Sequence, residues 1–236
     1  SSAIKKYADL FGVACGEKNI LFTNNDSVYE TAISLIQKGI KVQAIIDNRE
    51  EIDSKLIKET EKNNIKIYKG YTIVDTFGYK RINSVSIMKL SKDGQKVIGS
   101  KENISCDSLG ISGGWTPAVH LFTQSGGKLK FRDDDQVFIP NTYPSNQISI
   151  GSCNGDFTLD EILINTPKLL KEFLNIKKTE YENIEIYSAF NKSKRNIWLL
   201  PSNKIVGKTK SFVDFQNDAT AKDIKLALRE GFRSIE

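Results

Sequence analysis

The sequence has few of the residues on which hydrolytic and metal chemistry usually depend. It contains a single histidine, His120, and three widely separated cysteines, Cys15, Cys106 and Cys153. One histidine cannot form a His cluster around a metal, and no Gly-x-Ser-x-Gly sequence accompanies it to indicate a serine hydrolase. Without a Cys-x-x-Cys pair, the cysteines do not form a zinc, iron–sulfur or disulfide framework. We therefore predict no metal site, no catalytic residue in this chain and a reducing, cytoplasmic location.

Long hydrophobic runs and a strong charge of one sign are also absent. The longest apolar runs, such as Ile162-Leu163-Ile164, are far shorter than the roughly 20 residues that span a bilayer. The net charge of +5 is modest, and the densest basic cluster, at residues 191–195, has no stacking aromatic residues around it. We therefore predict that the chain binds neither membranes nor nucleic acid.

The hydrophobic segments near the N-terminus alternate between strand and helix periodicity. Apolar runs at Asn19–Phe22 and Lys41–Ile46 flank a segment, 28–36, with apolar residues at helical spacing. This pattern predicts a βαβ unit with parallel strands. A helix over about 51–63 and a strand over 65–68 are predicted to follow.

Beyond residue 71 the pattern changes to extended runs separated by turns. Ser91-Lys92-Asp93-Gly94 between Val85–Leu90 and Lys96–Ile98 predicts a hairpin, which is part of an antiparallel meander. We predict an α/β fold with a Rossmann-like parallel sheet, this meander and a short helical tail that begins with a capping box at Thr220–Asp223. Further strands are predicted at 106–112, 137–140, 147–150, 184–187 and 196–200, and a further helix at 159–174.

Two strand-to-helix turns are candidate ligand sites, because α/β proteins bind ligands at the carboxyl ends of parallel strands. The first is Thr23–Ser27, and Asp47 lies about 24 residues after its start, near the spacing of a carboxylate that binds a ribose hydroxyl. However, Gly-x-Gly-x-x-Gly is absent, and Asp26 is expected to cap the helix with a negative charge where phosphate would bind. Two alternatives follow: a dinucleotide site that uses Asn24, Asn25 and Asp47, or a capped helix without a ligand, which these residues favour.

The second candidate site combines two small-residue turns at the ends of apolar strands. Glycines allow a ligand to approach the backbone closely, and the later turn precedes a helix whose first-turn amides could bind an anion. Trp115 could stack on a ring. The residues of this site are Gly113, Gly114, Trp115, Gly151, Ser152, Cys153, Asn154 and Gly155.

Several longer blocks resemble the alpha subunit of heterotetrameric sarcosine oxidase. They are Thr23–Ser27, Gly113–Leu121, Gln124–Lys128, Phe212–Asp218, Thr220–Ile224 and Arg229–Ser234. The resemblance implies an internal fragment of that subunit, with Rossmann-like domains of the flavin disulfide reductase type. It implies an inserted NAD(P)-binding-like domain at 1–103, the returning half of a first FAD/NAD-binding-like domain at 104–204, and a helical connector towards a folate-binding domain at 205–236.

The resemblance also implies a function for the whole complex. Together with beta, gamma and delta subunits, such a complex oxidatively demethylates sarcosine to glycine, hydrogen peroxide and formaldehyde or methylene-tetrahydrofolate. FAD, FMN and tetrahydrofolate belong to the whole complex, and this chain would contribute part of an NAD site at Gly113, Gly114 and 151–155. Flavin reductases carry a Gly-Asp pair at this point; its carboxylate is expected to be missing here, which disfavours FAD and leaves NAD.

Two other functions remain as alternatives. The chain could serve a complex of the same architecture that oxidises another secondary amine or amino acid, or it could be a ligand-free Rossmann-like scaffold. In all three cases, surfaces that face other parts of the complex are expected to be apolar, with Trp115, Phe122 and Trp198 exposed.

Overall fold

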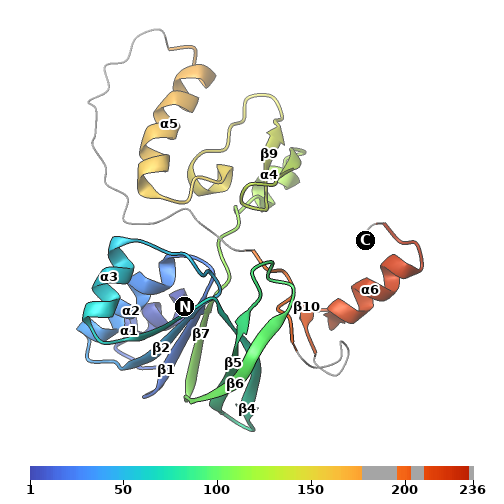
Figure 1. Cartoon of the computed structure of the whole chain (residues 1–236). Coiled ribbons are helices and arrows are strands. Elements are labelled where there is room, and N and C mark those ends of the chain that lie inside the picture. The colour runs from blue at the N-terminus through green and yellow to red at the C-terminus, as the bar shows by residue number, and fades with distance from the viewer. Residues whose placement is uncertain (177–195, 203–209, 234–236) are drawn as a thin grey trace.

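A four-stranded parallel sheet forms the centre of the fold in the computed structural model, which describes residues 1–176, 196–202 and 210–233 (Figure 1). The strand order is β3-β2-β1-β7. The predicted βαβ unit is confirmed, because α2 connects β1 to β2 and these two strands are parallel. The elements are β1 (Asn19–Thr23), α2 (Ser27–Gln37), β2 (Val42–Asp47), β3 (Lys66–Lys69) and β7 (Ser108–Ser112).

Three helices cover one face of this sheet: α1 (Ser2–Phe11), α2 and α3 (Lys55–Lys62) (Figure 1). Leu21 and Ile45 point to this side and form a buried cluster with apolar residues of the helices. Helix α1 was not predicted from the sequence. The start of α3 was predicted too early, because Ser54 is the N-cap and its hydroxyl accepts a hydrogen bond from the amide of Ile57.

An antiparallel meander packs against the other face of the sheet. It consists of β4 (Tyr71–Gly78), β5 (Ile82–Leu90) and β6 (Val97–Ser105), and it includes the predicted hairpin. Because side chains alternate along a strand, Ile20 and Phe22 of β1 face the meander and pack with Val85 and Ile87. The predicted α/β fold class, with a parallel sheet and an antiparallel meander, is confirmed.

A second group of elements lies beyond β7, at the carboxyl ends of the parallel strands (Figure 1). Aromatic packing occurs within this group: Phe122 packs edge-on against Tyr143 and lies directly beneath Gly127. The group consists of α4 (His120–Gln124), β8 (Lys128–Arg132), β9 (Val137–Thr142), the 3-10 helix η1 (Gly151–Asn154) and α5 (Leu159–Phe173).

The predicted helical tail is present as α6 (Ala221–Arg229), which opens with a capping box of Thr220 and Asp223. Two short strands that were not predicted, β10 (Phe212–Asp214) and β11 (Ala219–Thr220), precede it. The predicted strand at 147–150 is wrong: the segment is irregular and has no neighbouring strand in the described chain. Residues 196–200 likewise form no strand, and the predicted strand at 184–187 lies outside the described residues.

The predicted domain limit between residues 103 and 104 falls inside β6. The following strand, β7, pairs in parallel with β1 over its full length, so the first sheet extends to Ser112. The domain division stays a prediction. Among the described residues, no helix is long and apolar enough to cross a membrane.

One hydrogen-bonded contact between a carboxylate and the backbone depends on pH. The carboxylate of Asp107 accepts hydrogen bonds from the backbone amides of Glu17, at 2.9 Å, and Lys18, at 2.7 Å, and these bonds hold the pKa of Asp107 below its ordinary value. The stabilisation is therefore complete above the unfolded pKa of about 3.9 and is lost as the pH falls through the depressed folded pKa. We expect Asp107→Asn to weaken the acid dependence of the unfolding free energy below about pH 4.

Urea unfolding between about pH 5 and pH 2 measures this effect. Asp218→Asn, on the exposed turn before α6, is the control and should leave the acid dependence of the wild type intact. Parallel stability curves for Asp107→Asn and the wild type would contradict the assignment.

Candidate functional site

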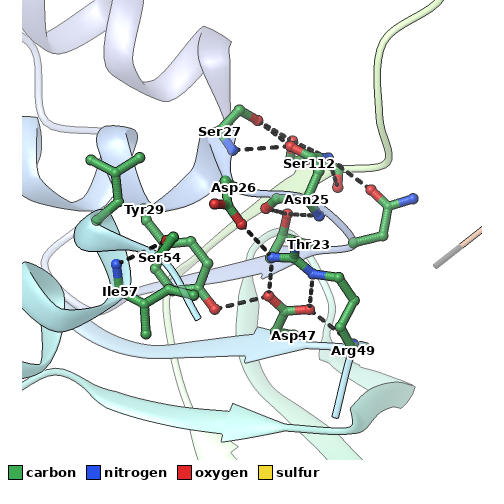
Figure 2. Close-up of polar contacts among 12 residues, drawn as sticks. Thr23, Asn25, Asp26, Ser27, Tyr29, Asp47, Arg49, Ser54, Ile57 and Ser112 are labelled. Atoms are coloured by element: carbon green, nitrogen blue, oxygen red, sulfur yellow. Dashed lines mark hydrogen bonds and ion pairs between the residues drawn. The ribbon is translucent and has the colours of Figure 1, made fainter. Parts of the chain in front are cut away.

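A buried charged cluster occupies the carboxyl end of β2, beside the first predicted turn (Figure 2). Arg49 donates to Asp47 from its Nε, at 3.0 Å, and its Nη2, at 2.7 Å, and Nη2 also lies 2.9 Å from Asp26. The hydroxyl of Tyr29 donates to Asp47 Oδ2, the oxygen that also accepts from Arg49 Nη2, at 2.8 Å. All four residues are buried, which makes this a closed internal network.

The charges of this cluster are mutually dependent. Burial by itself lowers the pKa of Arg49, but hydrogen bonding to Asp47 and the negative charges of Asp47 and Asp26 raise it overall. Burial, followed by the charge of Asp47, raises the pKa of Tyr29. The guanidinium and the phenol are therefore both fixed in their protonated forms.

This arrangement corrects two expectations about the first turn. Asp47 is completely buried and both of its oxygens are bound, so a ribose cannot reach it unless Arg49 moves. Asp26 stands at the N-cap position of α2, but its side chain is paired with Arg49 and does not cap the helix. Instead Asn25 accepts from the backbone amide of Ser27 at 3.0 Å.

The asparagines of the first turn join the ends of β1 and β7. Asn24 donates to the carbonyl oxygen of Gly113 at 3.0 Å, and Asn25 donates to the side chain of Asn24 at 2.7 Å. The Ser27 hydroxyl lies 2.9 Å from the Ser112 hydroxyl (Figure 2). The structure therefore brings Asn24 and Asn25 next to the Gly113-Gly114 turn, although the sequence placed them in separate candidate sites.

The second turn differs from its prediction at the helix that follows it. Gly151–Asn154 forms η1, and α5 begins only at Leu159. Glu161 accepts hydrogen bonds from the backbone amides of Phe157 and Thr158, both at 3.1 Å. A carboxylate thus already lies at the N-terminus of α5, and the expectation of a vacant anion site there is wrong.

A cavity of about 650 Å³ separates the first turn from the second group of elements. Asn25 and Ser27 line one side, and Gly155 and Trp115 line the other. Its described lining is strongly acidic, with Arg132 as the cation among Asp26, Glu30, Asp134, Asp135, Asp156 and Glu161. Arg132 is itself bound to Asp135 and donates to the carbonyl oxygen of Gly155 at 3.0 Å.

Asp156 was not predicted from the sequence as a site residue. This residue directly follows Gly155, so a Gly-Asp pair and its carboxylate are present at the turn, and the expectation that they were missing is wrong. Asp156 lines the cavity, and its Oδ1 accepts from Asn165 at 2.9 Å. Its Oδ2 is buried and has no hydrogen-bond partner in the described part of the chain. The dipeptide Gly155-Asp156 was the signal that could have identified it.

The remaining predicted residues have different surroundings. Trp115 lines the cavity and is half exposed, whereas Ser152 and Cys153 of η1 are exposed and do not line it. Asn154 accepts from the Tyr143 hydroxyl at 3.3 Å. No group of acidic, cysteine or histidine residues in the described ranges could hold a metal ion.

The expected exposure of three aromatic residues is correct for two of them. Trp115 is 50% and Trp198 is 76% exposed, but Phe122 is only 4% exposed. Its ring fills the space beneath Gly127, where an added Cβ would lie 2.4 Å from it. The packing of Phe122 thus belongs to the interior of the second group.

Among solved structures, the chain is similar to flavoprotein disulfide reductases. A thioredoxin reductase from T. acidophilum matches 64% of this chain and 53% of its own, with 18% identity and a TM-score of 0.41. The HOCl-induced flavoprotein disulfide reductase RclA from Escherichia coli matches 68% of this chain and 36% of its own, with 14% identity and a TM-score of 0.47.

Curated relatives are similar to this chain along its entire length. The alpha subunit of sarcosine oxidase from Corynebacterium sp. (strain P-1) is 27% identical over 245 residues, which cover 100% of this chain and 25% of the relative. The same subunit from Rhizobium meliloti (strain 1021) is 27% identical over 241 residues, covering 100% of this chain and 23% of the relative. A family model described as the sarcosine oxidase A3 domain matches residues 208–236.

The predicted resemblance to sarcosine oxidase alpha subunits is thereby confirmed. The chain spans about a quarter of the length of these curated relatives.

Proposed function

We propose that this chain is a dinucleotide-binding and assembly segment of the alpha subunit of a sarcosine oxidase, and that its cavity holds part of NAD. The observation that carries the proposal is Asp156, whose buried Oδ2 has no hydrogen-bond partner in the described structure although the residue lines the cavity. A buried carboxylate oxygen without a partner is costly, and rotation of the Asp156 carboxyl group towards the cavity would let a ribose hydroxyl supply the missing donor.

The Gly113-Gly114 turn supports the same proposal. An added Cβ at Gly113 would meet no atom of the described structure within 4 Å, and the backbone of Gly113 does not have the positive φ that favours glycine. Neither packing nor conformation therefore explains a glycine at this position. Close approach of a ligand to the backbone does explain it.

The charge of the cavity limits which part of the dinucleotide it holds. Acidic side chains dominate its lining, and the cation Arg132 is bound by Asp135. A pyrophosphate would be repelled there, and Glu161 already occupies the N-terminus of α5. We place a sugar and an adjoining ring in the cavity, beside Trp115, and the pyrophosphate outside it, towards another part of the full-length polypeptide.

The proposed activity belongs to the whole complex. Bound to beta, gamma and delta subunits in the cytoplasm, the alpha subunit takes part in the demethylation of sarcosine to glycine, hydrogen peroxide and formaldehyde or methylene-tetrahydrofolate. FAD, FMN and tetrahydrofolate serve that complex, and the residues that oxidise the amine lie on another chain. The role in assembly is supported by α5 and α6, which contain no fully buried residue, and by the exposed Trp198.

Asp156 also favours a second ligand. A Gly-Asp pair is what the flavin reductase resemblance requires, so FAD is an alternative occupant of the same cavity. The substrate has alternatives too, because a complex of this architecture could oxidise another secondary amine. A ligand-free scaffold is the third alternative, and it predicts that no nucleotide copurifies.

The test uses the full-length alpha subunit, coexpressed with its neighbouring subunits. We expect the wild type to produce peroxide with sarcosine and to release NAD when denatured. Gly113 lies two residues before the cavity-lining Trp115, so Gly113→Leu adds bulk beside the space assigned to the ligand, and its retained NAD should fall at least about tenfold without a change in melting temperature. Bound nucleotide is identified chromatographically, and this measurement distinguishes NAD from FAD.

Gly39→Ala is the control, and the opposite pair of effects is expected from it. Gly39 also has open space around it but adopts a φ of +74°, so this variant should lose stability and keep its nucleotide. If Gly113→Leu retains a full complement of NAD, the cavity is not the NAD site. If sarcosine gives no peroxide while another N-methyl amine does, the substrate proposal fails.

A further inference from the structure

We propose that Asn196 is a positioning residue that latches together the two walls of the cavity, and that this latch controls the access of the dinucleotide. The ligand in this inference rests on the proposed function. The latch itself is a property of the two walls and can be tested without any nucleotide.

One amide group bridges the walls. The Oδ1 of Asn196 accepts from Asn24 at 3.3 Å, and its Nδ2 donates to the carbonyl oxygen of Asp135 at 3.2 Å. Asn24 follows β1 of the first sheet, whereas Asp135 belongs to the turn between β8 and β9. An asparagine can perform both tasks because its side chain carries a donor and an acceptor.

The hydrogen bonds continue from this bridge to both glycine turns. On one side, Asn24 also donates to the carbonyl oxygen of Gly113. On the other side, the Asp135 carboxylate accepts from Arg132 at 2.7 Å, and Arg132 donates to the carbonyl oxygen of Gly155. Asn196 therefore lies at the middle of a continuous polar network that connects the two parts of the predicted site.

The segment that carries Asn196 has a further attachment to each wall, because Leu200 packs against the buried cluster between the first sheet and the meander, and Trp198 contacts the β8–β9 turn. The indole Nε1 of Trp198 donates to the Oε1 of Gln136 at 2.8 Å. This contact fixes the segment to the β8–β9 turn, while the side chain of Asn196 reaches across to Asn24. Loss of the Asn196 amide should thus remove the polar bridge at the cavity and leave the two walls joined on this side by the contacts of Trp198 and Leu200.

The covalent connection between the walls is able to bend. Residues 113–119 contain no helix or strand; an added Cβ at Gly113 would meet no described atom within 4 Å, and one at Gly114 would meet the side chain of Asn24 at 3.9 Å. Hydrogen bonds between neutral amides contribute little net free energy, so a latch made from them can open as well as close. A ligand that binds between the walls would favour the closed state.

The test is a distance measurement between α3 and α5 in the full-length protein. Spin labels are attached at Glu59→Cys and Glu172→Cys, both exposed positions, in a chain that also carries Cys15→Ser and Cys153→Ser so that no accessible native thiol is labelled. Without nucleotide, we expect a narrow distribution of distances when Asn196 is present and a broader one with Asn196→Ala. Asn141→Ala, which removes an exposed asparagine of β9, should give the distribution of the unsubstituted chain.

Nucleotide affinity supplies the second measurement. Asn196→Ala should raise the dissociation constant of NAD about fivefold, the effect of losing one net hydrogen bond. Asn196→Gln keeps the same amide and should recover part of this loss. Such a rescue is expected of a positioning residue.

The possible results separate the latch from the proposed function. If the protein binds no NAD but Asn196→Ala broadens the distances, the latch stands and the proposed ligand is wrong. If NAD binds and Asn196→Ala changes neither the distances nor the affinity, the latch is wrong and the proposed ligand stands.

Discussion

Replacement of Arg49 by methionine is expected to lower the free energy of unfolding by about 3–5 kcal/mol. The guanidinium neutralises the buried carboxylates of Asp47 and Asp26, and its loss leaves two negative charges without a counter-ion in the interior. Removing one partner of a buried ionic network costs more than the network itself contributes, because the remaining charges stay desolvated. Chemical unfolding of the full-length protein, followed by a probe of the parallel sheet, measures the effect.

Two further variants test the cause. Arg81→Met changes the same residue type at an exposed position and should alter stability by less than about 0.5 kcal/mol. Adding Asp26→Asn and Asp47→Asn to Arg49→Met removes the uncompensated charges and should restore part of the loss. A cost below about 1 kcal/mol for Arg49→Met would mean that water reaches the cluster and that the network is not closed.

Substitution of Gly78 by alanine is expected to destabilise the meander by about 4 kcal/mol. Gly78 ends β4 with a φ of +138°, a conformation that L-residues rarely adopt, which contributes about 1–3 kcal/mol of strain. An added Cβ would also lie 1.9 Å from the carbonyl oxygen of Arg81, and displacing this backbone contributes about 1–3 kcal/mol more.

Gly99→Ala provides the comparison for Gly78→Ala. Gly99 lies in β6 with a φ of +78° and has no atom within 4 Å of an added Cβ, so only backbone strain of about 1–2 kcal/mol is expected. Thermal unfolding of the two variants separates strain from steric overlap. Equal losses of stability would show that the hairpin end relaxes and that the overlap at Gly78 carries no cost.

The local patterns of the sequence were sufficient for most of the elements. The βαβ unit, the hairpin around Asp93-Gly94 and the α6 capping box follow from periodicity or from residues a few positions apart, and the structure has all three. The strand predicted at 147–150 failed because an apolar run becomes a strand only when another strand pairs with it. Nothing in the run itself specifies that partner.

Local sequence patterns did not predict the contacts of the candidate site residues. The sequence placed Asp47 correctly at the end of β2, yet it did not indicate that Arg49 folds back onto it and removes it from any ligand. It treated the turn near Asn24 and the turn at Gly113 as separate sites, whereas the pairing of β1 with β7 brings them together. Asp156 was also missed, because only the structure shows that it lines the cavity and that its Oδ2 has no hydrogen-bond partner among the described residues.

The sequence by itself thus determined the α/β class and most of the helices and strands, because side-chain periodicity, capping and turn residues act over a few neighbouring positions. The resemblance to sarcosine oxidase alpha subunits depended on longer blocks of residues such as Gly113–Leu121. The tertiary structure decided which carboxylates are neutralised, which line the cavity, and that Asn196 lies between Asn24 and Asp135. Burial, the pairing of Arg49 with Asp26 and the Asn196 bridge involve segments far apart in the chain, so they exist only after the chain has folded.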